Sequence, residues 1–192
     1  EKTEQRRSDL STIAIGATGP RAGSADLTAV QLIESVMSGE GGRLSSELRD
    51  KQGVTFTAVL NSEAMFVAGF VSAYATTSPE FEQRAQAALR GEFEKLARSG
   101  LTTDELTSGR AMATTALVAE LQSQPQHALR YARAVFYRQP PADVDNISEQ
   151  ISKVTPEDIK RVAAAFLKPS AGVIKGSSHQ PPTTQQAPPK QN

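Results

Sequence analysis

The chain has 192 residues, and 38% of them are hydrophobic, which is enough to bury the core of one domain. Its 21 basic and 21 acidic residues cancel, so no overall charge draws it to nucleic acid, an anionic membrane or an acidic substrate. It contains no cysteine, which excludes disulfides, thiolate catalysis and cysteine metal ligands but leaves the redox compartment open.

The first elements expected are a strand and a helix. Residues 10–15 alternate loosely and have a β-branched bias, which predicts a strand that is followed by a glycine-rich turn. Apolar residues at helical spacing then predict a helix that ends at residues 38–39. Either Ser24 or Asp26 is expected to cap its amino end.

Residues 41–56 are the most informative segment, because a glycine turn opens a short charged helix that leads directly into a strand. Gly53 is expected to end the helix in the left-handed conformation, and the strand is expected over residues 54–60. Residues 61–63 are expected to turn the chain. Residues 65–73 read as apolar on both alternating faces and predict an interior strand that is buried on both sides.

Helices dominate the second half of the chain. One is expected from Ser78-Pro79 to Ser99-Gly100, because an apolar stripe runs along it. Thr102 and Glu105 have the spacing of a capping box, which predicts a second helix as far as about Gln122.

A third helix is expected to start at Pro125 and end near Pro140-Pro141. It mixes bases with aromatic residues, which could suggest single-stranded nucleic acid as a partner. The neutral charge balance favours a simpler interpretation, with one packed face and one solvated face. The residues expected to be buried are Leu129, Ala132, Val135 and Phe136.

The end of the chain predicts a short helix over 144–151, a helix opened by Thr155-Pro156 and a last strand over 171–175. Residues 1–176 are expected to form one domain. Residues 177–192 are expected to be a Pro/Gln-rich tail, because they have no apolar pattern.

The targeting signals are few. Glu1 stands where an initiator Met would be, so we expect a segment excised or processed from a longer chain. No apolar run reaches the roughly 20 residues that span a bilayer, so we expect no membrane partner.

Neither a metal site nor a catalytic site of its own is predicted for this chain. His127 and His179 have no second ligand one helical turn away, so a surface or packing role is expected. No Gly-x-Ser-x-Gly elbow occurs, and the loop 38–42 lacks the ending of a phosphate cradle, so a helix end and a turn are favoured there. Neighbouring carboxylates are expected on exposed helix surfaces or first turns, and they are Glu92 with Glu94, Asp104 with Glu105, and Glu157 with Asp158.

Arg49 and Phe56 are the candidate substrate-binding residues, because a helix end and the strand after it would bring them to one edge of the sheet. A guanidinium could hold a peptide carbonyl or carboxylate while the ring packs beside the bound chain. The alternative is a surface salt bridge for Arg49 and core packing for Phe56.

At these residues the chain resembles the C-terminal, non-zinc-binding domain of insulinase/pitrilysin-family zinc metallopeptidases. The resemblance is to the bacterial members of this family that are similar to the mitochondrial processing peptidases. The resemblance covers about residues 8–176. It depends on the Gly-Gly-Arg-Leu-Ser-Ser-Glu-Leu-Arg-Asp-Lys-Gln-Gly segment together with Val154-Thr155-Pro156-Glu157-Asp158-Ile159. It implies an α+β fold, a LuxS/mitochondrial-processing-peptidase-like metallohydrolase half-domain whose mostly antiparallel sheet is backed by several helices.

The resemblance also implies a function. Such a half-domain would form part of the substrate chamber of a zinc metalloendopeptidase that cleaves unfolded peptides, and would bind extended peptide along a sheet edge. Zinc would be held by the missing N-terminal half or by a partner subunit, either of which would carry the zinc-binding motif His-x-x-Glu-His. Homo-oligomers and a periplasmic or cell-envelope location are further expectations of the same kind.

In the family, an arginine and a tyrosine of this half reach the scissile peptide. Arg49 matches the arginine, whereas Phe56 stands at the tyrosine position without the hydroxyl. The alternative function is therefore a catalytically inactive scaffold or assembly subunit of the same fold.

Overall fold

The computed structural model describes residues 2–5, 9–39, 41–167 and 173–177. The strands are β1 (Lys2–Gln5), β2 (Ser11–Gly19), β3 (Thr57–Glu63), β4 (Gly69–Thr77) and β5 (Val173–Ser177). The helices are α1 (Leu27–Met37), the π-helix η1 (Ser45–Lys51), the 3₁₀ turn η2 (Pro79–Phe81), α2 (Glu82–Ser99), α3 (Thr103–Leu121), α4 (Gln124–Phe136), α5 (Ala142–Asp145), α6 (Ile147–Lys153) and α7 (Pro156–Phe166).

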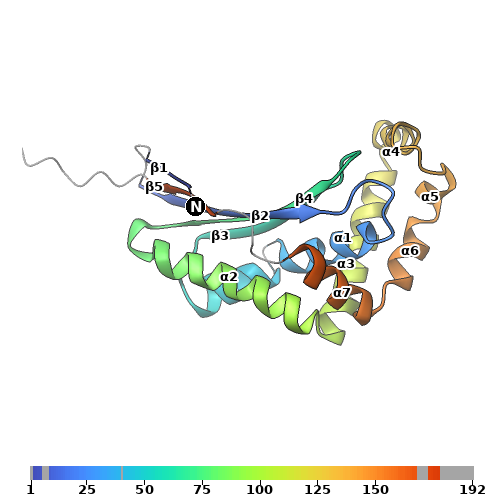
Figure 1. Ribbon diagram of the computed structural model, residues 1–192. Helices are drawn as coiled ribbons and strands as arrows, with labels where there is room; N and C mark the ends of the chain where they lie inside the picture. The colour runs from blue at the N-terminus through green and yellow to red at the C-terminus, as the bar shows by residue number, and fades with distance from the viewer. Residues whose placement is uncertain (1, 6–8, 40, 168–172, 178–192) are drawn as a thin grey trace, which may run out of the picture.

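The five strands form one sheet in the order β1-β5-β2-β4-β3. β1 pairs in parallel with β5, and the other pairs are antiparallel. The helices α1, α2 and α7 lie beneath one face of the sheet, while α4 and α5 lie beyond its end (Figure 1). The expected α+β fold, with a mostly antiparallel sheet backed by helices, is therefore confirmed.

The hairpin of β3 and β4 lies further along the chain than expected. Residues 61–63, expected to turn, belong to β3, and the turn comes at residues 64–68. A Cβ on Gly69 would lie 2.3 Å from the Pro20 carbonyl oxygen and 2.4 Å from that of Glu63, so β4 can approach its neighbours this closely only with glycine there.

The expectation that this interior strand is buried on both faces is wrong. β4 does lie between β2 and β3, but its residues alternate strictly. Val71 and Ala73 are buried, whereas the Phe70 and Tyr74 side chains on the other face are 38% and 41% exposed. Antiparallel sheets commonly bury one face and leave the other open.

The core lies between the buried sheet face and the helices. α1 and α2 each place one apolar stripe against the sheet, and η1 supplies Leu48. The largest side chains buried there include Ile13, Leu32, Leu60 and Phe93.

Several helix ends agree with their sequence signals. Gly53 and Gly100 have φ angles of 62° and 72°, which confirms the left-handed stop expected at Gly53. Thr102 and Thr155 both form complete capping boxes. Asp26 is the N-cap residue of α1, but its side chain makes no cap; its Oδ1 instead accepts from Arg161 Nη2 at 2.8 Å.

Other expectations about the second half of the chain need correction, and one concerns residues outside the described ranges. The short helix over 144–151 is two helices, α5 and α6. In α4 the residues expected to be buried are exposed, and Ala134 is buried instead. Apart from Ser177, which ends β5, the tail over 177–192 lies outside the described residues. Within the ranges that the structure describes, no helix is long and apolar enough to cross a membrane.

The Thr155 cap predicts a stability that depends on pH. Asp158 accepts from the Thr155 backbone N–H at 3.1 Å and its hydroxyl at 2.8 Å, and these bonds lower the pKa of Asp158. A lowered folded pKa gives stability that is present above the unfolded pKa, about 3.9, and lost as pH falls through the folded pKa. Thr155→Ala should therefore cost about 1 kcal/mol at neutral pH and less in acid. Urea unfolding of both proteins across this range is the measurement, and a difference that does not shrink in acid contradicts it.

Candidate functional site

The glycine-rich loop after α1 forms a helix end and a turn, as expected. The Ser38 N–H donates to Glu34 O at 2.9 Å, and Gly39 follows with a φ of 87°. The Gly42 N–H then donates to Gly39 O at 3.1 Å, which closes the turn. A Cβ on Gly42 would lie 2.1 Å from Ser38 O, so the chain can turn this tightly only with glycine at 42.

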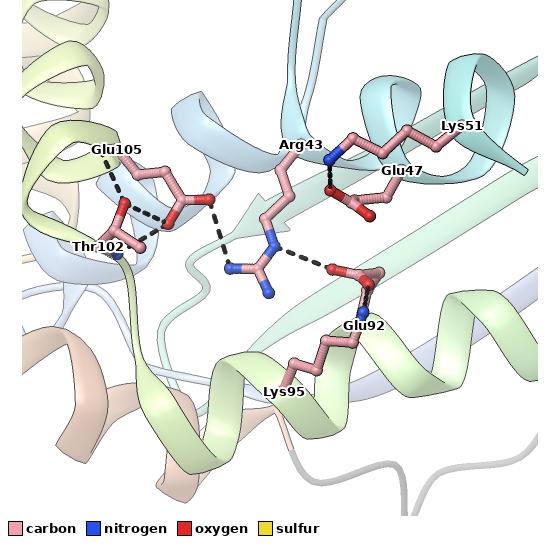
Figure 2. Close-up of polar contacts among 7 residues, drawn as sticks. All are labelled: Arg43, Glu47, Lys51, Glu92, Lys95, Thr102 and Glu105. Carbon is pink, nitrogen blue, oxygen red and sulfur yellow. Dashed lines mark hydrogen bonds and ion pairs between the residues drawn. The ribbon is translucent and has the colours of Figure 1, made fainter.

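Arg43, directly after this turn, ties the loop to two helices (Figure 2). Its Nε lies 2.9 Å from Glu92 Oε2 on α2, and its Nη1 lies 3.5 Å from Glu105 Oε1 on α3. Lys95 Nζ contacts the other Glu92 oxygen at 2.6 Å. Glu92 was expected on an exposed helix surface, and that is wrong: the residue is 1% exposed. Its burial and its pairing with cations indicate a structural role rather than acid/base catalysis.

The helix η1 presents one buried side and one charged side. Leu44 and Leu48 are buried, whereas Lys51 and Glu47 form an outer ion pair at 2.5 Å. The hydrogen bond that Glu47 accepts from Lys51 lowers the pKa of Glu47. The Val54 N–H donates to Leu48 O at 2.9 Å, which fixes the exit of the chain toward β3.

Arg49 lies on this helix with its side chain 38% exposed, and its Nε donates to Asp50 Oδ1 at 2.9 Å. The surface ion pair considered for Arg49 is therefore present. Phe56 is 54% exposed, so the core packing considered for its ring is wrong. Both residues precede the edge strand β3, against which η1 packs.

A shift in strand alternation explains the exposure of Phe56. Its N–H donates to Thr76 O at 2.8 Å, and Thr57 pairs with the same Thr76. Two successive residues facing one partner residue is the arrangement of a β-bulge, which re-aims side chains. Without it, Phe56 would lie on the core face with Ala58 and Leu60; with it, Phe56 and Thr57 are both exposed.

The side chain of Glu34 on α1 and that of Ser38, which caps the end of α1, occupy part of the outer edge of β3. Ser38 Oγ accepts from the Leu60 N–H at 2.8 Å and donates to Leu60 O at 2.5 Å. Glu34 Oε2 accepts from the Ser62 N–H at 3.1 Å and from its hydroxyl at 2.5 Å, while burial raises the pKa of Glu34. A peptide strand cannot pair with these backbone groups while Ser38 and Glu34 hold them. No sequence pattern signals this contact beyond the i, i+4 spacing of two polar residues, Glu34 and Ser38, at a helix end.

A cleft of about 870 Å³ lies apart from Arg49 and Phe56, between the start of α1 and helices α4 to α6. Arg130, Arg133, Lys153 and Arg161 line it, as do Glu63, Glu120, Asp143 and Asp158, so its charges cancel. This balance favours neither an anion nor a cation as ligand.

The described residues do not fit a zinc ion. No group of three or more His, Asp or Glu side chains converges anywhere in this part of the chain. His127 packs its ring 5.1 Å from that of Tyr131, while His179 lies outside the described residues.

Comparison with known proteins relates the chain to zinc proteases. Residues 1–112 match the family model of the peptidase M16 inactive domain. An uncharacterized zinc protease of Streptomyces coelicolor is 29% identical over 146 residues, which are 71% of this chain and 30% of that protein.

Solved structures share the fold. The peptidase M16 inactive domain from Pseudomonas fluorescens has a TM-score of 0.84 and 19% identity, over 93% of this chain and 43% of that one. A chain of Complex III2 from Candida albicans has a TM-score of 0.75 and 15% identity, over 92% of this chain and 45% of that one. The chain thus spans less than half the length of these relatives. Since the inactive-domain model matches more than half of its residues, the chain belongs to the peptidase M16 family and carries that family's inactive domain.

Proposed function

We propose that this domain forms one wall of the substrate chamber of a zinc metalloendopeptidase that cleaves unfolded peptides. The observation that carries the proposal is the exposure of Phe56 beside an arginine-bearing helix at the edge of the sheet. An aromatic ring aimed at solvent by a bulge is available to a ligand, and a core position is not.

The chemistry of the two side chains fits a peptide. Arg49 offers guanidinium N–H groups to a peptide carbonyl or a carboxylate, and the Phe56 ring offers an apolar surface to the adjacent side chain. Because Ser38 and Glu34 occupy the outer edge of β3 at Leu60 and Ser62, we assign pairing of the peptide backbone to another part of the enzyme.

Zinc in this proposal comes from a homologous zinc-binding half-domain or subunit. The described residues do not fit the ion, so no step of hydrolysis is assigned to them. The chain alone should neither hydrolyse an unfolded peptide nor bind zinc at one ion per molecule. Assays of purified chain with a quenched fluorescent peptide and with metal analysis test this, and either activity or stoichiometric zinc contradicts it.

In the assembled peptidase, Arg49→Ala should lower kcat/KM for an unfolded peptide by about 100-fold, because a positioned donor to the substrate is lost. Lys51→Ala is the matched control, since Lys51 is also an ion-paired cation of η1 and should leave kcat/KM unchanged. Steady-state hydrolysis of one peptide by the three proteins is the measurement. Equal activities would remove Arg49 from the site.

A second candidate is a catalytically inactive scaffold or assembly subunit. Two observations favour it: Phe56 has no hydroxyl to donate, and a chain of Complex III2 shares the fold. Phe56→Tyr distinguishes the candidates. A gain in kcat/KM of the assembly supports the chamber wall, and an assembly that is inactive with either residue supports the scaffold.

A further inference from the structure

Two side chains at the end of α1, those of Ser38 and Glu34, are here called the covering pair because they cover the outer edge of β3. Ser38 Oγ accepts from the Leu60 N–H at 2.8 Å and donates to the Leu60 carbonyl oxygen at 2.5 Å. In an antiparallel sheet, the residue of a neighbouring strand makes these same two bonds with its partner. Glu34 accepts the next outward N–H, that of Ser62, at 3.1 Å. The covering pair therefore takes the place of a further strand.

The spacing of the covering pair matches the spacing of the strand. One turn of an α-helix rises about 5.4 Å, and two residues of an antiparallel strand span about 6.8 Å. Side chains four residues apart on a helix can therefore reach alternate backbone groups of a strand. Ser38 is itself held in position, because its N–H donates to the Glu34 carbonyl oxygen at 2.9 Å.

The middle of β3 carries none of the usual features that keep an edge strand from pairing with another chain. β3 lies at one edge of the sheet. Residues 57–62 contain neither a charged residue nor a proline, which natural edge strands use against such pairing. The bulge at Phe56 disturbs the start of the strand, and the charge of Glu63 lies at its end. The covering pair protects the stretch between them.

We propose that the covering pair prevents β3 from pairing with β3 of a second copy of this chain. In an antiparallel pair centred on Leu60, each Glu63 would lie opposite Thr57 of the other copy, so like charges would not face one another. The strand is therefore compatible with itself once its outer backbone groups are free. This inference goes beyond the proposed function, because it applies to a chamber wall and to a scaffold alike and does not involve Arg49.

A single fluorescent label tests the proposal in the whole chain. The chain has no cysteine, so Asn61→Cys provides one site for pyrene on an exposed residue of β3. Ser38→Ala combined with Glu34→Ala should produce excimer emission, which requires two pyrenes in contact, and should shift sedimentation from monomer to dimer. Dilution should reverse both changes. The labelled chain with the covering pair intact should give neither, and excimer emission from it would overturn the proposal.

A matched double variant on the same helix is the control. Ser35→Ala removes a hydroxyl that donates to the Gln31 carbonyl oxygen at 2.9 Å rather than to β3. Glu34→Gln keeps a side-chain oxygen that can accept the Ser62 N–H. The chain with both of these changes should remain monomeric. Equal association of the two double variants, or a folded Ser38→Ala/Glu34→Ala chain that stays monomeric, would overturn the proposal.

A further variant distinguishes strand pairing from association through misfolding. Val59→Lys, added to Ser38→Ala/Glu34→Ala, should restore the monomer, because a lysine on an edge strand opposes pairing. Association that persists with this lysine would overturn the proposal. Cooperative urea unfolding shows which variants are folded. If the double variant is not, Ser38→Ala alone is compared with Ser35→Ala, since Ser38→Ala by itself frees both backbone groups of Leu60.

Discussion

Replacing Arg43 with alanine should lower the free energy of unfolding by about 3–5 kcal/mol, because it removes one partner of a buried ion pair. The Glu92 side chain is 2% exposed, and Arg43 Nε lies 2.9 Å from its Oε2. Among the described residues its remaining cation is Lys95, whose side chain is 52% exposed. The variant therefore leaves a carboxylate in the core with a solvated partner. Urea unfolding at neutral pH measures the loss.

Two controls separate burial from charge. Lys51→Ala removes a cation from an exposed pair on η1 and should leave the free energy of unfolding nearly unchanged. Arg43→Met combined with Glu92→Leu removes both charges and should recover most of the loss, because no unpaired ion stays buried. A loss below about 1 kcal/mol for Arg43→Ala would contradict the prediction.

The helix ends could be predicted from the sequence because their signals are local. Thr102 with Glu105 forms the expected capping box, and Gly53 stops η1 in the expected conformation. In each case the interacting groups lie within a few residues of one another. The family resemblance followed from two such local patterns taken together, around residues 41–53 and residues 154–159, and the family model confirms it.

The features that were predicted wrongly depend on contacts between residues that are far apart in the sequence. Periodicity shows that α4 has an apolar stripe, but it cannot show which side faces the domain. Glu92 reads as a surface carboxylate until Arg43, 49 residues away, is placed beside it. The core packing considered as the alternative for Phe56 fails because the bulge opposite Thr76 shifts the alternation of the strand.

The candidate site was predictable in position but not in detail. Arg49 and Phe56 do lie at the end of a helix and the start of the edge strand. The expected pairing of peptide along this edge does not hold at Leu60 and Ser62, since α1 side chains occupy their backbone groups. A side chain reaching across from another element leaves no trace in the strand it protects.

Gly42→Ala should destabilise the protein by about 3 kcal/mol or more, because its Cβ would overlap backbone atoms. The Cβ would lie 2.1 Å from Ser38 O and 2.5 Å from Ser38 C. Backbone cannot rotate aside as a long side chain can. Shifting Ser38 would also disturb its two hydrogen bonds to Leu60, which join α1 to β3.

Gly41→Ala is the matched control, one residue earlier in the same turn. A Cβ there would meet no atom within 4 Å, and its φ lies outside the left-handed region. Alanine should therefore be tolerated and could raise stability by about 0.4–1 kcal/mol by restricting the unfolded chain. Thermal and urea unfolding of both variants measure the contrast. Equal stabilities for Gly41→Ala and Gly42→Ala would show that the turn can open, and that Arg43 and η1 are held by something other than this close approach.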